Sequence, residues 1–346
     1  MADEVSSSGA TNIACEDGST RFEGYQPSGR GRWLRLTLGA ILSAGVIYWL
    51  SRSLDISHTL AAMRAAHGGW LLLAVATVLL TLWARVLRWH VLLDSTRVSW
   101  SATLRALVLG QLLNLMLPAR LGDLGRAYLI AGDGYPSQAR ALGTLVVEKL
   151  WDVLLLVGLV LALSFWQPLP VWAVVPARLA AALGGLLLVG VVIPLLFRRR
   201  LLDLAPLTHW PWLARWMGQL SDGLAAVQRP RVMLAAGVWS LLAWFLGALT
   251  NLAVLKALRL PGSLGGAFFV LAVLQLGVAV PSVPGRIGVF EGLCVGALTF
   301  LGMDPSLALG YGVVLHAVVL LPPTSLGLWW LARLDPSARR AVWNRV

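Results

Sequence analysis

Charged residues are scarce in this sequence, and that scarcity excludes a soluble globular protein. Only 13% of the 346 residues are Asp, Glu, Lys or Arg, whereas a soluble domain carries about 25%. Apolar residues make up 58% of the chain, and the mean hydropathy is +0.76. With their flanks, most of the apolar runs reach the roughly 20 residues that a helix needs to cross a bilayer. The runs are Leu36–Leu50, Trp70–Leu82, Val153–Phe165, Leu179–Phe197, Val232–Leu255, Leu264–Val283 and Leu307–Leu331.

Cysteines and catalytic motifs are also scarce. The two cysteines, Cys15 in a polar segment and Cys294 in an apolar one, make no recognisable disulfide or metal site. The chain has no Gly-x-x-x-x-Gly-Lys-[Ser/Thr] nucleotide-binding motif and no His-Glu-x-x-His or Gly-x-Ser-Gly pattern. We therefore expect no cofactor, no metal and no enzymatic activity. A membrane glycosyltransferase is less favoured, because the outer loop 51–69 offers Asp55 as its one acid.

The basic residues are almost all arginine, 26 against two lysines, and the net charge is +12. With the N-terminus placed in the cytoplasm, 19 basic residues fall in cytoplasmic segments, five in outer segments and four inside the membrane. The positive-inside rule then predicts a plasma (inner) membrane protein with both termini in the cytoplasm. This distribution argues against a nucleic-acid partner. Arg85 and Arg88, at the inner end of a span, are interpreted as interfacial anchors.

The chain divides into two halves around a basic connector, and its first apolar run is expected to be an uncleaved span. We expect an all-α polytopic membrane protein with about seven transmembrane helices plus two re-entrant helical hairpins in inverted-topology halves. The expected parts are a disordered cytoplasmic tail (1–32), a transmembrane domain (33–332) with halves at about 33–197 and 232–332 around the connector 198–231, and a cytoplasmic tail (333–346). Apolar residues spaced by three and four predict an amphipathic helix in the connector, either in the headgroup layer or packed on the bundle.

The hairpins are predicted from one short pattern that occurs twice. Pro118 and Gly122 bound PARLG, and Pro284 and Gly288 bound PGRIG, 166 residues later. The arms around Pro118 are about 14 residues each, too short to span at about 1.5 Å per residue. Broken segments at matching places in inverted halves are typical of a transporter's binding site. We therefore expect turns at Pro118, Gly122, Pro284, Gly285 and Gly288.

Charges at bilayer depth are costly and usually functional. Eight are expected there, namely Arg120, Asp123, Arg126, Glu148, Lys149, Asp152, Arg286 and Glu291. The hypothesis is that the two turns meet near the midplane, where Arg120 and Arg286 bind an anionic headgroup. The N–H groups of the helices that follow Gly122 and Gly288 would add donors.

The acids would balance these arginines or take up a proton, and the alternative is that all these charges form internal salt bridges. The acids concerned are Asp123, Glu148, Asp152 and Glu291. Glu148 and Asp152 share one helix face. Lys149 could instead reach the cytoplasmic surface, and His316 is interpreted as a hydrogen-bonded packing residue.

Three motifs resemble the transmembrane region of the lysylphosphatidylglycerol synthase/flippase family. They are NLMLPARLGDLGRA (114–127), VVEKLWD (146–152) and SVPGRIGVFEG (282–292). The matching positions are Asn114, Pro118, Arg120, Gly122, Asp123 and Arg126, then Glu148, Lys149 and Asp152, then Pro284, Gly285, Gly288 and Glu291. Arg286 departs from the family pattern, which has glycine there. The resemblance covers roughly residues 35–333 and implies re-entrant helices and a role as a lipid flippase or lipid-pathway accessory.

The combined expectation is a flippase or transporter for an anionic or isoprenoid lipid. Arg120, Arg126, Arg286 and Asn114 are the candidate headgroup-binding residues. The expected partners are membrane lipids and lipid-biosynthesis enzymes. The alternative is a non-catalytic accessory subunit of a lipid, hopanoid or polyprenyl-glycan pathway. Lipid aminoacylation is not expected, because 14 residues follow the last span.

Overall fold

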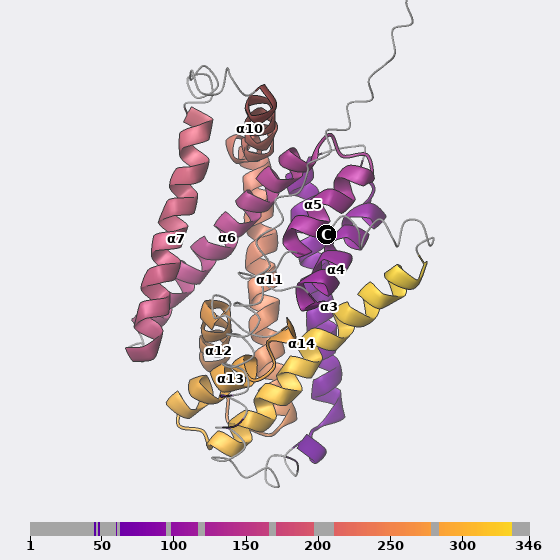
Figure 1. Cartoon of the computed structure of the whole chain (residues 1–346). Helices are drawn as coiled ribbons and strands as arrows, with labels where there is room; N and C mark the ends of the chain where they lie inside the picture. Colours follow the sequence, from indigo (N-terminus) through magenta and orange to yellow (C-terminus); the bar gives the residue numbers. More distant parts are fainter. Residues whose placement is uncertain are drawn as a thin grey trace, which may run out of the picture.

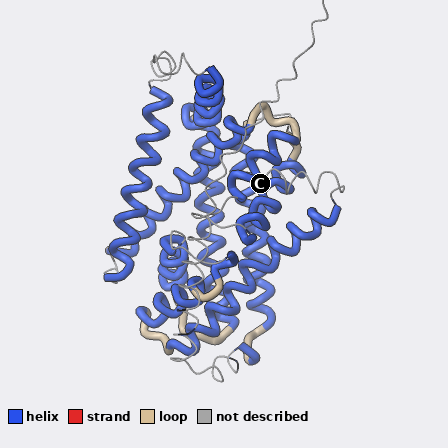
Figure 2. Tube along the Cα trace, viewed as in Figure 1, coloured by secondary structure: helices blue, strands red, loops and turns tan. Residues whose placement is uncertain are grey.

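The computed structural model describes residues 45, 48, 60, 63–94, 98–116, 122–165, 171–196, 211–277 and 284–333. Within these ranges the regular structure is entirely helical (Figure 2). The predicted tails, most of the first apolar run, and Pro118 and Arg120 lie outside the described residues.

Two sets of helices follow each other in the same order. The first set is α3 (Gly68–Leu93), α4 (Trp100–Met116), α5 (Gly122–Gly132) and α6 (Gln138–Ser164). The second set is α11 (Pro230–Ala257), α12 (Leu264–Leu276), η4 (Pro284–Arg286), α13 (Val289–Phe300) and α14 (Pro305–Arg333). Between them lie α7 (Val171–Leu196), α10 (Pro211–Leu224) and the short η2 (Ala225–Gln228).

The long helices α3 and α11 lie antiparallel along the centre of the bundle (Figure 1). At one end the His67 N–H donates to the Ala257 carbonyl at 2.8 Å. At the other end Arg229 forms an ion pair with Asp94. Between these ends the hydroxyls of Thr77 and Thr250 are 2.9 Å apart. The first helix of each half therefore packs on its counterpart in the opposite direction.

The other helix contacts repeat between the halves. In each half the two short helices pack on each other, and the second of them packs on the long helix that follows. Across the halves, α14 contacts α3 and α4, and α6 makes the matching contacts with α11 and α12. Figure 1 shows the α4–α5 and α12–α13 pairs toward opposite ends of the molecule. This arrangement is the inverted repeat that the Pro-x-Arg pattern predicts.

The four short helices flank the two copies of the repeated pattern. They are 17, 11, 13 and 12 residues long, below the roughly 20 residues of a span. Three helices, α3, α11 and α14, are long and apolar enough to cross a membrane. The count of seven spans and the depth of the hairpins in the bilayer stay predictions.

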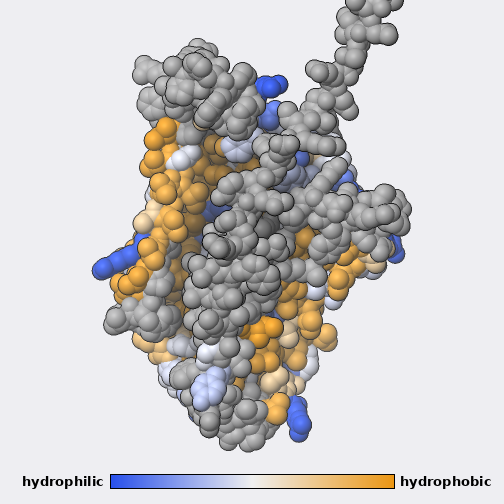
Figure 3. Space-filling view, viewed as in Figure 1, coloured by the Kyte–Doolittle hydropathy of each residue, from blue (hydrophilic) through white to orange (hydrophobic). Residues whose placement is uncertain are grey.

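Apolar side chains cover the flanks of the bundle. Seven large apolar residues are exposed on α7, namely Val175, Leu179, Leu183, Leu186, Leu188, Val189 and Ile193. Figure 3 shows apolar surface along the α7 flank and along α14. Exposed apolar surface of this extent is typical of a lipid-facing protein. The chain is an integral membrane protein.

The amphipathic helix predicted in the connector is α10, and it packs on α6. The two helices meet at Gly143 and Gly223, whose Cα atoms face each other so closely that a Cβ on either glycine would collide with backbone. Of the two interpretations of this helix, the structure shows the one in which it packs on the bundle.

Candidate functional site

Six charged side chains gather where α3, α5 and α6 meet, and we call them the six-charge cluster. Its members are Arg88 of α3, Asp123 and Arg126 of α5, and Glu148, Lys149 and Asp152 of α6. Three are basic and three are acidic, so the cluster has no net charge. Asn114 of α4 and Ser240 of α11 add hydrogen bonds to it. Five helices from both halves therefore meet at one polar site.

Arg88, Arg126 and Glu148 form the buried inner part of the cluster, with side chains 3% to 5% exposed. One carboxylate oxygen, Glu148 Oε1, lies 2.9 Å from a guanidinium nitrogen of each arginine. Among the described residues, Glu148 Oε2 and the Nε atoms of both arginines have no hydrogen-bond partner. A buried charge without its partner is strongly destabilising. Each of the three side chains therefore depends on the other two.

Trp89 fixes the position of Arg126. The Arg126 guanidinium lies over the indole ring, 5.0 Å from its centroid, in a cation–π arrangement. The indole is fully buried, and its Nε1–H donates to Thr144 Oγ1 at 3.2 Å. Because α3, α5 and α6 all contribute to this stack, the arginine has little freedom to leave Glu148.

The outer part of the cluster consists of Asp123, Lys149 and Asp152, whose side chains are 25% to 36% exposed. Lys149 Nζ lies 3.2 Å from Asp123 and 4.0 Å from Asp152. Asp152 also contacts Arg88 at 2.6 Å, and Asp123 accepts a hydrogen bond from the Asn114 amide at 3.2 Å. This outer part is the more exposed side of the cluster.

Arg88 differs from its sequence-based interpretation. Arg88 is not an interfacial anchor, because it is 2% exposed and paired with Glu148 and Asp152. The apolar residues after it were the missed signal, since α3 continues to Leu93. Lys149 pairs with Asp123 and Asp152, which is the arrangement that the salt-bridge alternative predicts. Ser240 Oγ accepts a hydrogen bond from Arg88 at 3.2 Å, and no pattern in the sequence marked this serine as a site residue.

The acid of the second half has a different partner. Glu291 Oε1 lies 2.7 Å from His316 Nδ1 on α14, and Glu291 Oε2 accepts the Gly288 N–H at 2.7 Å. The Gly288 N–H is therefore already used within the protein, and the expectation that the first N–H groups of α13 donate to a headgroup stays a prediction. His316 is hydrogen-bonded, as interpreted from sequence, but its pairing with Glu291 was not foreseen.

The second turn packs against the end of α4. Gly285 and Gly288 have φ of 76° and 88°, and Arg286 between them has φ of 58°. A Cβ on Gly285 would be 3.2 Å from Leu115 Cδ1, so the turn lies beside the residue that precedes the first motif's turn. Arg286 is half-buried. Its pairing with Arg120 around a headgroup stays a prediction.

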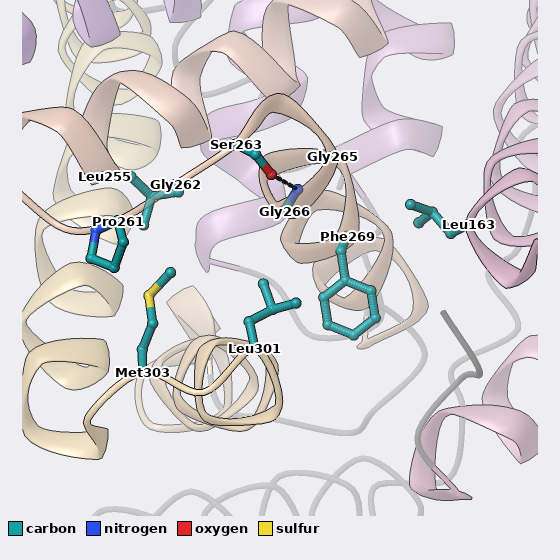
Figure 4. A pocket seen from close by; sticks show the side chains of 10 residues that line it. All are labelled: Leu163, Leu255, Pro261, Gly262, Ser263, Gly265, Gly266, Phe269, Leu301 and Met303. Carbon is teal, nitrogen blue, oxygen red and sulfur yellow. Dashed lines mark hydrogen bonds between the residues drawn. The ribbon is translucent and has the colours of Figure 1, made fainter. Parts of the chain in front are cut away.

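A separate cavity of about 500 Å³ lies at the base of the second hairpin (Figure 4). Its walls are mostly apolar and include Leu255, Phe269 and Met303. Ser263, the polar side chain in its wall, already accepts the Gly266 N–H at 3.1 Å. Leu255 is fifteen residues beyond Ser240 on α11, which places it about 22 Å along the helix from the six-charge cluster. The cavity is therefore not the charged site.

Comparison with known families gives one match. The model of the lysylphosphatidylglycerol synthase TM region matches residues 36–327, which include every residue of the six-charge cluster. No curated protein and no solved structure matches the chain.

Proposed function

This chain belongs to the family of the lysylphosphatidylglycerol synthase TM region, and on that premise we propose that it is a lipid flippase. It moves an anionic or isoprenoid lipid across the inner membrane, with both termini in the cytoplasm. The path is a groove between the two hairpins, whose turns carry Arg120 and Arg286. No covalent chemistry is assigned to it.

The observation that carries this proposal is the six-charge cluster. Each ionised residue at bilayer depth is costly and usually marks a substrate or ion pathway. This cluster gathers six ionised side chains at the first hairpin, from three helices, and we propose that it lies at bilayer depth. A cluster needed only to hold three helices together could be replaced by apolar packing at little cost in stability.

The two parts of the cluster suggest how a headgroup is bound. A lipid phosphate first meets Lys149, which is the most exposed base of the cluster. It then competes with Asp123 and Asp152 for the guanidinium groups of Arg126 and Arg88. Guanidinium groups suit phosphate because their N–H fork matches two oxygens at once. Glu148 keeps both arginines in place while the outer acids give way.

A second candidate function is favoured by a different aspect of the same cluster. Every charged member has an oppositely charged partner within 4 Å, which is the pattern that an accessory subunit without a substrate would need. In that case the charges serve only to hold the helices, and conservative replacements are tolerated.

A reconstituted flipping assay tests the proposal. Purified protein is placed in vesicles that contain phosphatidylglycerol with a fluorescent acyl chain, and an added reductant quenches the outer leaflet. Wild type is expected to expose nearly all of the label, and Arg126→Lys to slow the exchange at least about tenfold, because a point charge does not replace the planar fork.

Arg105→Lys is the matched control, since Arg105 pairs with Asp133 at the base of the same hairpin and outside the cluster. It is expected to flip lipid as the wild type does. Labelled polyprenyl phosphate in parallel vesicles separates an isoprenoid substrate from a phospholipid. No exchange of either lipid by the wild type would reject the flippase and favour the accessory subunit.

A further inference from the structure

The Glu291–His316 pair, between α13 and α14, is the buried acid–base contact that the proposed headgroup site does not use. His316 Nδ1 and Glu291 Oε1 are 2.7 Å apart, and the two side chains are 12% and 11% exposed. The second carboxylate oxygen accepts the Gly288 N–H at 2.7 Å. Both oxygens of Glu291 are therefore engaged, one by a side chain that can gain or lose a proton.

The surroundings hold the imidazole against the carboxylate. The His316 ring stacks on Phe290, with ring centroids 4.3 Å apart. One turn earlier on α14, a Cβ on Gly312 would be 3.2 Å from the Glu291 Cα. The two helices thus approach each other closely beside the pair.

Few other titratable groups lie near the pair. α13 carries Cys294 and α14 carries Tyr311, whose hydroxyl donates to Asn251 at 2.7 Å. η4 carries Arg286, and α12, the other helix packed on α13, has no titratable side chain. The titratable side chains on the helices that pack on α14 are Arg85, Arg88, His90, Arg105, Arg231 and Lys256. Among the described residues, His316 is the basic group within 4 Å of Glu291.

The charge of the pair changes when it binds one proton. With a neutral imidazole and an ionised carboxylate the pair carries one negative charge, and a bound proton makes it neutral. Charge at bilayer depth is costly, so the dry state favours the protonated pair and the wet state the deprotonated one. Imidazole is the side chain whose charge changes between about pH 5 and 8. The six-charge cluster, in contrast, is already neutral with groups that keep their charge in that range.

We propose that Glu291 and His316 form a proton-binding site, and that proton uptake and release there couple lipid movement to the transmembrane proton gradient. The coupling rests on the proposed flippase function, whereas the proton binding does not. Glu291 also caps α13 through Gly288, and a hydrogen bond to an ionised carboxylate is stronger than one to a neutral group. Protonation therefore acts directly on the turn that carries Arg286.

Two measurements on the full chain test this proposal. In vesicles with labelled phosphatidylglycerol, an imposed gradient of one pH unit is expected to change the wild-type exchange rate at least about threefold between the two gradient directions. Glu291→Gln and His316→Gln are expected to exchange lipid at a rate that no longer depends on the gradient. Glu291→Gln keeps an oxygen for the Gly288 N–H, so the capped turn is retained. Asp304→Asn, which removes a carboxyl but keeps a cap for α14, is the control and should respond as the wild type does.

Infrared difference spectra between pH 5 and pH 8 give the second readout, which needs no transport. Imidazole and carboxyl bands that change in the wild type should be lost in both variants and kept in Asp304→Asn. If the wild type moves lipid with no gradient response, the coupling is overturned and the flippase stands. If it moves no lipid, the flippase fails, and the spectra alone decide the proton site. Unchanged spectra in Glu291→Gln and His316→Gln would overturn the proton site itself.

Discussion

The two halves of this bundle share one helix order and one turn pattern, but they bury charge in different ways. The first half ties its hairpin to the following helix through Arg126 and Glu148, within six side chains of zero net charge. In the second half, the ion pair that the described residues form between the hairpin and the following helix is Glu291 with His316. Each of these pairs links the second helix of a hairpin to the long helix that follows. The hairpin contributes the base in the first half and the acid in the second.

This difference teaches what each half can respond to. Arginine keeps its charge at any physiological pH, so the first half holds fixed charges and can exchange partners only with another charged group. Histidine is the side chain used for charge changes near neutral pH, and the second half is where we propose that a proton binds. The same architecture thus places a site for charged groups at one end and a titratable pair at the other.

The largest expected difference between the halves is in the stability lost when the buried glutamate of each half is replaced. Glu148→Gln leaves Arg88 and Arg126 buried without their shared carboxylate, and we expect it to reduce the free energy of unfolding by about 3–5 kcal/mol. Glu291→Gln should cost less than half of that, because it leaves no permanently charged arginine without its partner. Reversible unfolding in mixed detergent micelles measures both, and equal losses would contradict the comparison.

The next largest difference is in how tightly the arms of each hairpin pack. A Cβ on Gly122 would overlap the Gly110 carbonyl and lie 2.6 Å from the Asn114 nitrogen. Because these are backbone atoms, which cannot move aside as a side chain can, Gly122→Ala should reduce the free energy of unfolding by about 1–3 kcal/mol. A Cβ on Gly277 in the second hairpin would meet the flexible Leu293 side chain, and Gly277→Ala should cost less than about 1 kcal/mol. Melting temperatures in one detergent compare them, and a larger drop for Gly277→Ala would reverse the ranking.

A smaller effect is expected where the halves join at Ser240. Its hydroxyl accepts from Arg88 at 3.2 Å, so Ser240→Ala should cost about 0.5–1.5 kcal/mol, as a lost buried hydrogen bond does. Ser325→Ala is the control, because that exposed hydroxyl donates only to Leu321 of its own helix. The same micelle unfolding assay applies, and an unchanged stability for Ser240→Ala would remove this link between the halves.

The smallest effect is expected at the hairpin bases. Arg105 and Asp133 form an ion pair at 2.5 Å between the outer ends of α4 and α5, and both side chains are partly exposed. Arg105→Ala should therefore reduce the free energy of unfolding by about 0.2–1 kcal/mol, and by less in high salt. Asp304 follows the second hairpin and caps α14 by accepting from two backbone N–H groups. Asp304→Ala should therefore lose stability that salt hardly changes. Melting curves at low and high salt distinguish the two, and a salt-independent Arg105 effect would contradict the assignment.

Much of the fold could be predicted from the sequence. Apolar runs near 20 residues long predicted α3, α11 and α14, and the recurrence of Pro-x-Arg-x-Gly predicted two broken segments in opposite orientations. Less of the site could be predicted. The pairing of Asp123 with Arg126, and the shared face of Glu148 and Asp152, followed from helical spacing. The role of Arg88 did not, because it is 35 residues from Asp123 in the chain and was counted as the end of a span.

The sequence by itself determined that this chain lies in a membrane, where its helices break, and that its halves are inverted, because composition and local pattern decide those properties. Only the tertiary structure decided which charges meet. Arg88 could have faced the cytoplasm, and His316 could have packed alone against apolar neighbours. The packing of α3 on α6 places Arg88 beside Glu148, and the packing of α13 on α14 places His316 beside Glu291. The energy of a buried charge depends on the distance to its partner, and helix packing sets that distance.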